Sequence, residues 1–174
     1  MPTPSRTSID EIVAAGGEIL ESRGLPGLTM QAVAQSVGVK APSLYKHVED
    51  RDALVRLVAD AAAIGLAAQL TTETTLAGLG HGLRTWATAH PQSFRLVFSG
   101  LGSREAAAAA GAPVLGIAAA LAGEADALAA ARLITSWAMG FISMELAGAF
   151  QLGGNVDEAF EYGLERLTSA LEAY

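Results

Sequence analysis

Apolar residues recur every three or four positions along most of the chain, which is the spacing of helices that bury one face. Ser8 and Glu11 form a capping box, and the apolar positions behind it predict a first helix that ends at Gly24. Thr29 can cap a short second helix, and Pro42 suits the first turn of a very short third helix. The N-terminal pattern therefore predicts three helices joined by tight turns.

The rest of the chain continues the helical pattern. Asp50 or Asp52 can open a fourth helix that runs to about residue 70, and the polar run TTETT ends it. Further helices are expected at 76–90, from Pro91 onward, at 106–122 with an interruption near Gly111 and Pro113, at 124–151, and at the C-terminus up to residue 171. No segment alternates as a strand does, so the predicted fold class is all-α with about nine helices.

Composition supports a globular helical protein and excludes several kinds of chemistry. Hydrophobic residues make up 51% of the chain and charged residues 17%, and there is no cysteine. Disulfides, thiolate metal sites and cysteine nucleophiles are therefore excluded. The polar start MPTPSRTS does not resemble a secretion signal, and the uncharged stretches 106–123 and 133–144 are interpreted as buried helices. We expect a cytoplasmic protein with no membrane partner.

The formal charge of −7 is distributed unevenly. Residues 1–58 carry six Lys or Arg against seven Asp or Glu, whereas residues 59–174 carry five against eleven. The stretch GVKAPSLYKHVEDRD, residues 38–52, gathers Lys40, Lys46 and Arg51 around Tyr45. This part of the chain can meet DNA phosphates although the chain as a whole is acidic.

The same stretch fits the packing pattern of a helix-turn-helix. If Gly38 is the ninth of twenty positions, where the chain turns, small Ala34 falls where the two helices cross. Six of the seven key positions match, and His47 is the exception; the positions that hold the two helices together are Val33, Val37, Val39 and Leu44. Such a turn allows the second helix to enter the major groove of DNA.

Residues 28–55, LTMQAVAQSVGVKAPSLYKHVEDRDALV, resemble the DNA-binding domain of the tetracycline-repressor family. The resemblance implies a DNA-binding domain at 1–52 and a ligand-binding and dimerisation domain at 53–174, with the helix 53–70 linking the two. It implies contacts to DNA by Thr29, Gln31, Lys40, Ala41, Pro42, Ser43, Tyr45, Lys46, His47 and Arg51. Thr29, Tyr45 and Arg51 would meet phosphates, residues 40–43 would face bases, and His47 would mainly pack in the turn. An equal alternative for any one of three residues is a plain structural role, in which Lys40 and Lys46 solvate a surface helix and Tyr45 fills the edge of the core.

The C-terminal half is similar to one subgroup of this family. HGLRTWATAHPQSFRLVF and SWAMGFISMELAGAF resemble the C-terminal domain of the subgroup named for a tryptophan–histidine–glycine signature. Met139 stands before Gly140 where that subgroup often has histidine, so a ligand contact by histidine is not carried over. The resemblance implies a homodimer that binds a small-molecule inducer.

An aromatic and thioether set in this half is suited to a mostly apolar ligand: Trp86, Phe94, Phe98, Trp137, Met139, Phe141 and Met144. Each of these residues, taken singly, is more often a core side chain. Glu145 is a lone carboxylate among hydrophobes and needs a partner. Arg84, a backbone cap, the dimer mate or the ligand could serve, and an internal structural partner is preferred.

The helix predicted at 124–151 is apolar on all sides, so it must be covered on all sides, either as a central core helix or with a partner chain on one side. Gly140, Ala147 and Gly148 would permit close approach of a second copy. An apolar stripe on the last helix would complete a four-helix dimer interface: Phe160, Leu164, Leu167 and Leu171.

Catalysis is not expected. His81 and His90 are nine residues apart, which places them on opposite faces of a helix, and no nucleophile or carboxylate is placed beside them by a motif. We expect no cofactor and no metal. The sequence predicts a ligand-responsive transcriptional regulator, a repressor released from a palindromic operator by a small inducer. The alternative is a helical small-molecule-binding or adaptor protein with a vestigial helix-turn-helix.

Overall fold

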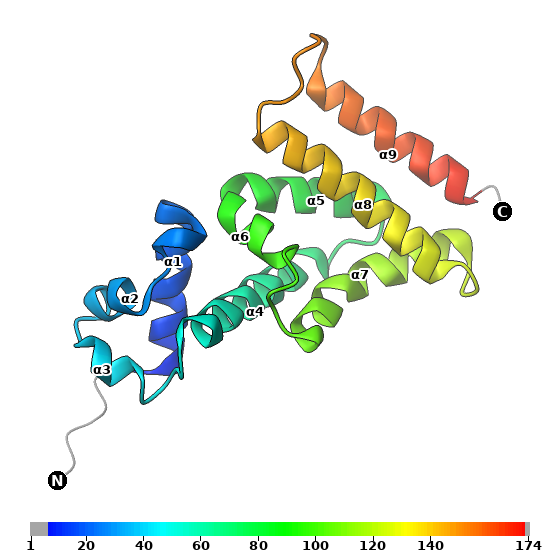
Figure 1. The fold of residues 1–174 in the computed structure, drawn as a ribbon. Coiled ribbons are helices and arrows are strands. Elements are labelled where there is room, and N and C mark those ends of the chain that lie inside the picture. Colours follow the sequence, from blue (N-terminus) through cyan, green and yellow to red (C-terminus); the bar gives the residue numbers. More distant parts are fainter. Residues whose placement is uncertain (1–6, 173–174) are drawn as a thin grey trace. The chain divides into compact units, whose positions relative to one another are not determined.

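The computed structural model describes residues 7–172, and within that range it is built from helices alone (Figure 1). Residues 1–6, on which the expectation of no secretion signal partly rests, lie outside the described part. The helices are α1 (Ile9–Gly27), α2 (Met30–Ser36), α3 (Ala41–Leu44), α4 (Arg51–Leu70), α5 (Leu76–Ala89), α6 (Pro91–Val97), α7 (Arg104–Ala122), α8 (Ala127–Leu146) and α9 (Val156–Glu172). The all-α prediction is confirmed.

The chain folds as two compact units. The first extends to Gly65 and also contains His90–Ala107, whereas the second contains Leu66–Ala89 and the chain from Ala108 onward. The first unit is larger than the domain predicted at 1–52, because α6 packs on α1 and Leu96 enters the same core. The functional division at residue 52 stays a prediction.

The core of the first unit joins α1, α2, α3 and α4. Its fully buried side chains are Ile12, Leu28, Val33, Leu44 and Leu54. A Cβ atom at Gly16 would lie 2.6 Å from Cγ2 of Val58, so this glycine lets α1 and α4 approach closely. Gly24 has φ +67° and ends the regular part of α1, as predicted.

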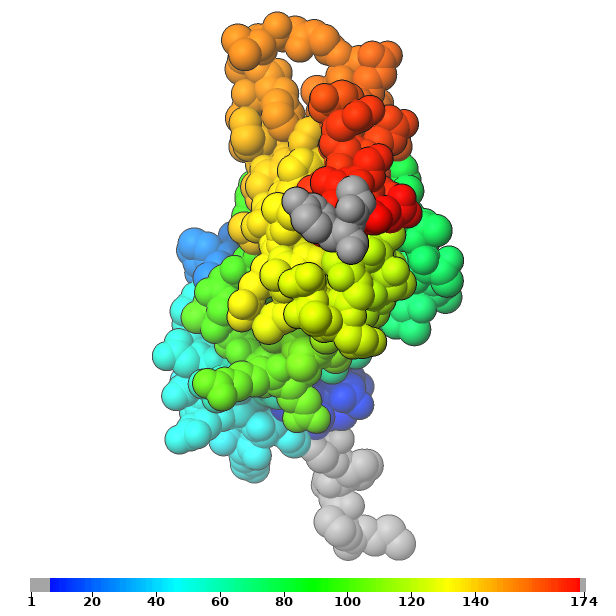
Figure 2. Space-filling model, turned by 90° about the vertical axis from the view of Figure 1, so that its right-hand side faces the viewer, coloured from blue at the N-terminus to red at the C-terminus, as the bar shows by residue number. Residues whose placement is uncertain are grey.

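The core of the second unit lies where α5, α8 and α9 meet. A Cβ atom at Gly80 would lie 2.6 Å from Cδ2 of Leu164, so α5 and α9 are in close contact there. Phe160 and Ile142 are completely buried. The connection between α8 and α9 projects from this unit (Figure 2). Leu152 in this connection is fully exposed.

Two predicted helices in the C-terminal half were wrong in their extent. The helix α7 runs without a break through Gly111 and Pro113. The helix α8 ends at Leu146 and not near residue 151, because Gly148 adopts φ +62°. Its N–H donates to the Glu145 carbonyl at 2.9 Å and that of Ala149 donates to the Met144 carbonyl at 2.9 Å, which is the Schellman ending of a helix.

Three helices, α4, α7 and α8, are long and apolar enough to cross a membrane, judged by length and composition alone. The sequence interpretation treated the stretches in α7 and α8 as buried helices. In the structure only 22% of the most apolar window of α7 and 33% of that of α8 is buried. The interpretation was therefore wrong in degree: the single chain leaves apolar surface on both helices uncovered.

Candidate functional site

The turn between α2 and α3 has the geometry that the sequence predicts. Gly38 has φ +71°, a left-handed conformation that costs glycine little. Its N–H donates to the Gln35 carbonyl at 3.3 Å, and the N–H of Val39 donates to the Ala34 carbonyl at 2.9 Å. These two bonds close the last turn of α2 and direct the chain straight into α3.

The two helices are held at a fixed angle by the core beneath them. Ala34 is 2% exposed at the crossing point, and Val33 and Leu44 are completely buried. The Thr29 hydroxyl accepts a hydrogen bond from the N–H of Ala32 at 3.1 Å and so caps α2. α2 is therefore capped by Thr29 and packed with α3 on one core, and contact of Thr29 with phosphate stays a prediction.

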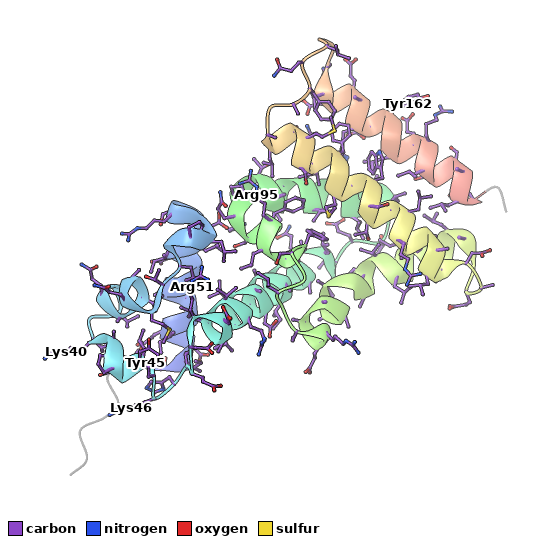
Figure 3. The ribbon with its side chains drawn as sticks, viewed as in Figure 1. Lys40, Tyr45, Lys46, Arg51, Arg95 and Tyr162 are labelled. Carbon is purple, nitrogen blue, oxygen red and sulfur yellow. The ribbon has the colours of Figure 1, made fainter. Side chains whose placement is uncertain are left out.

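The predicted DNA-contacting residues lie on and beside α3. Lys40 is the residue before α3, Tyr45 and Lys46 follow it, and all three are exposed (Figure 3). Tyr45 is 55% exposed, which is high for an aromatic ring and leaves its hydroxyl free to reach a phosphate. Gln31 and Pro42 are also exposed, and Ala41 and Ser43 are half-buried.

His47 does not pack in the turn as expected, because its side chain is exposed. The turn is held by backbone bonds instead, since the N–H of His47 donates to the Leu44 carbonyl at 2.8 Å. The buried position is taken by the next residue, Val48, which is 2% exposed. His47 is thus available at the surface.

Arg51 has a structural role that the sequence did not indicate. Its Nε donates to the Leu28 carbonyl at 2.9 Å and its Nη2 to the Leu25 carbonyl at 2.8 Å. Both carbonyls follow the break in α1, where regular helical pairing ends, and that of Leu25 also accepts from the N–H of Leu28 at 3.3 Å. Arg51 therefore ties the start of α4 to the end of α1, and its contact with phosphate stays a prediction for its remaining N–H groups.

A hollow of about 470 Å³ lies between α2 and α3. Its polar lining comes from Gln31, Gln35 and Lys40. Two amides and one ammonium group can hydrogen-bond base edges or phosphates. Gln35 was not singled out from the sequence, although it stands four residues after Gln31, the spacing that places two residues on one helix face.

The predicted ligand-contacting residues belong to both units. Phe94 and Phe98 belong to the first unit, where their ring centroids lie 5.1 Å apart and Phe94 is 1% exposed. The other members belong to the second unit: half-buried Trp86, Trp137, Met139 and Phe141, and exposed Met144. Neither unit contains the whole set, and one ligand pocket lined by all of these residues stays a prediction.

Trp137 and Phe141 pack into an aromatic core. Trp137 stacks on Phe160 with centroids 5.3 Å apart, and Phe141 lies 5.1 Å from Phe160 and 4.8 Å from Phe150. The ring of Trp137 also occupies the space that a side chain at Gly163 would need. The core role weighed for these two residues therefore fits the structure.

Glu145 has an internal partner, the preferred alternative. Arg84 donates from Nε to one Glu145 oxygen at 2.8 Å and from Nη2 to the other, and it donates to Asp157 at 2.6 Å. Its guanidinium carbon lies 4.8 Å from the centroid of the Phe160 ring. The pKa of Arg84 is raised above its ordinary value, first by the hydrogen bond to Glu145 and then by that to Asp157, while burial opposes the rise. This fork joins α5, α8 and α9.

The predicted dimer residues divide into inward-facing and outward-facing sets. Phe160 is completely buried and Leu164 is 2% exposed, so both hold α9 to its own chain and do not face a partner. Gly148 ends α8, and Ala147 beside it is exposed. Gly140, Leu167 and Leu171 are half-buried, so part of their surface is left for a partner. Exposed apolar side chains that the sequence did not assign to a dimer lie on α8: Leu128, Leu133 and Met144.

The helix α7 borders two hollows in the second unit. One, of about 470 Å³, has Thr71, Glu73 and Thr74 opposite an α7 wall that includes Pro113 and Ile117. The other, of about 440 Å³, lies against α8 and is mostly apolar, with Leu115, Leu128 and Arg132 in its lining. The hollows exist because the side chains of α7 are small. The sequence analysis did not predict them, because a run of alanine does not indicate a binding site.

Comparison with known proteins agrees with this geometry. Residues 12–58 match the family model of bacterial regulatory proteins of the tetR family, and residues 76–167 match that of the tetracyclin repressor-like C-terminal domain. The chain belongs to the TetR family. Resemblance to the tryptophan–histidine–glycine subgroup stays a prediction.

Among TetR relatives, the class E tetracycline repressor of Escherichia coli is 35% identical over 57 residues. These residues cover 33% of this chain and 27% of that repressor, so the match spans about a quarter of the relative. The crystal structure of BioQ from Mycobacterium smegmatis has a TM-score of 0.68 and 25% identity, covering 96% of this chain and 98% of that one. A TetR variant from Acinetobacter baumannii in complex with minocycline has a TM-score of 0.72 at 20% identity, covering 96% and 97%. The latter shares the fold.

Proposed function

We propose that this chain is a cytoplasmic, ligand-responsive transcriptional repressor that binds a palindromic operator as a homodimer. The observation that carries the proposal is the left-handed turn at Gly38, which presents α3 with exposed Lys40, Tyr45 and Lys46 above a buried core. Membership of the TetR family supports a DNA-binding role and not an enzymatic one.

On DNA, the start of α3 meets base edges while flanking side chains meet phosphates. Lys40, Ala41, Pro42 and Ser43 form the N-terminal part of the recognition helix, and Gln31 and Gln35 border it. Tyr45 and Lys46 hold the helix in the groove through the backbone. Two copies would occupy successive major grooves about 34 Å apart.

The second unit supplies the ligand site and the dimer contacts. The hollows on either side of α7 have volumes within the range of small-molecule sites, and their alanine-rich walls suit a mostly apolar ligand. The exposed apolar face of α8 suits a second copy. Release requires a ligand that favours the non-binding conformation; about 5.5 kcal/mol of differential affinity takes an equilibrium from 99:1 to 1:99.

The proposal is tested by selecting duplexes from a random pool and measuring affinity by fluorescence anisotropy at increasing salt. We expect enrichment of a palindrome. If each copy neutralises about two phosphates, log K should fall with log salt with a slope of about −3.6. Failure to select any duplex at low salt would overturn the repressor function and favour the helical ligand-binding or adaptor alternative.

A further inference from the structure

The first turn of α6 is held by a side chain from a distant part of the sequence. The Glu21 carboxylate on α1 accepts hydrogen bonds from the N–H of Gln92 at 3.1 Å and from that of Ser93 at 2.8 Å. The N-cap residue of α6, His90, makes no side-chain capping bond, and Pro91 has no N–H. Two N–H groups that the first turn of this short helix cannot pair within the helix are thus satisfied by α1.

Residues 90–107, which we call the docked segment, are held to the first unit at two further points. Leu96 of α6 is 3% exposed in the core formed with α1 and α4. The Asp60 carboxylate of α4 accepts from the N–H of Ser103 at 2.7 Å, where α7 is about to begin. A Cβ atom at Gly102 would lie 3.1 Å from the same Asp60 oxygen, so glycine permits this approach.

The docked segment is joined at both of its ends to the second unit. The segment belongs to the first unit, yet both the residue before it, Ala89, and the residue after it, Ala108, belong to the second. A rearrangement of the second unit that moves Ala89 and Ala108 would therefore act on both ends of the docked segment. The first turn of this segment is attached to α1 by hydrogen bonds. These are the pair of bonds made by Glu21.

We propose that Glu21 is a positioning residue that couples the docked segment to the helix-turn-helix, so that DNA binding and the conformation of α6 respond to each other. The inference rests on the proposed repressor function and adds to it a residue that touches neither DNA nor ligand. Coupling is reciprocal, so bound DNA must stabilise the docked form of α6 as much as docked α6 favours DNA.

Hydrogen exchange of the full-length protein tests this, with the DNA chosen as the duplex that the wild-type protein selects. The variant is Glu21→Ala. The matched control is Glu18→Gln, since Glu18 is an exposed carboxylate on the same helix and its side chain makes no hydrogen bond in the described structure. Glu21→Gln is the conservative variant, because its one amide oxygen can replace only one of the two acceptors.

In wild type and Glu18→Gln, added DNA should slow exchange in both residues 29–47 and residues 92–97. In Glu21→Ala, exchange at 92–97 without DNA should be about tenfold faster, and DNA should protect 29–47 alone. Glu21→Gln should lie between. A merely structural cap would raise exchange throughout the first unit and leave the response of 92–97 to DNA intact.

Two results overturn the inference and can be told apart. If Glu21→Ala binds DNA and residues 92–97 are protected as in wild type, the coupling role fails while the repressor function stands. If wild type selects no duplex, the repressor function fails and the coupling falls with it.

Discussion

At the scale of single residues, glycine is favoured for two different reasons, a positive φ or a close neighbour. Gly38 and Gly148 have positive φ and end helices, whereas Gly16 and Gly80 permit close helix contacts. Gly163 belongs to the second kind, since the Trp137 ring occupies the place of its missing side chain. The cost of adding one methyl group therefore depends on which kind of glycine receives it.

Gly163→Ala should destabilise the protein by about 1–3 kcal/mol, because the new methyl group overlaps the Trp137 ring and forces it off Phe160. The matched control is Gly17→Ala in α1, where a Cβ atom meets nothing within 4 Å. That change should stabilise by about 0.5–1 kcal/mol. Urea unfolding of both variants decides the matter, and equal stabilisation would contradict the packing described around Trp137.

At the scale of elements, the proposed DNA contacts of the α3 region are of two kinds, to base edges from the start of the helix and to phosphates from the residues after it. Lys40 immediately precedes the helix, and Tyr45 and Lys46 follow its end (Figure 3). Base contacts discriminate between sequences, whereas phosphate contacts strengthen binding to all of them. Substitutions at the two ends should therefore differ in kind.

Tyr45→Phe, which removes only the hydroxyl, should weaken binding to every duplex by about 1 kcal/mol, about fivefold. Ser43→Ala and Lys40→Ala should change the preferred base at one position of each half-site. Ser22→Ala serves as control, since its hydroxyl donates within α1 to the Glu18 carbonyl. Competition binding across a set of single-base duplex variants measures both effects. Identical preference profiles for all three α3-region variants would refute the division.

How far each element could be predicted depends on the range of its interactions. The caps at Ser8 and Thr29 and the turn at Gly38 were predictable, because residues within three or four positions determine them. The bonds of Arg51 to carbonyls of residues 25 and 28, and of Glu21 to α6, were not predictable, because 23 to 72 residues separate the partners.

Periodicity also shows which residues share a face without showing what covers it. Phe160 and Leu164 were assigned to a dimer interface from their stripe, yet α5 and α8 of the same chain cover them. Arg84 was among the partners considered for Glu145, because a half-buried carboxylate needs a donor. The sequence limited the partners of Glu145 to a few candidates, and the structure shows that Arg84 is the partner.

At the scale of the whole molecule, the uncovered apolar surface of α8 is the main sign of a partner. Leu128 is 55% exposed and Leu133 47% exposed, on a helix whose other side is buried in the second unit. A second copy would cover this surface and would bring two recognition helices to one operator.

Leu133→Lys should therefore shift the monomer–dimer equilibrium toward monomer by at least about a hundredfold, because a charge without a partner would enter the interface. The control is Ile64→Lys, since Ile64 is 57% exposed on α4. Sedimentation equilibrium measures the dissociation constants. A dimer of unchanged affinity in Leu133→Lys would remove α8 from the interface.

Both tryptophans of the chain, Trp86 and Trp137, belong to the second unit, and the first unit contains none. Intrinsic fluorescence excited at the indole band is therefore an optical signal from the second unit alone. A ligand that disturbs the stack of Trp137 on Phe160 should change the emission directly. DNA bound to the first unit should change the emission only if its binding alters the conformation of the second unit. Tryptophan emission is therefore a label-free measure of the coupling between the two units.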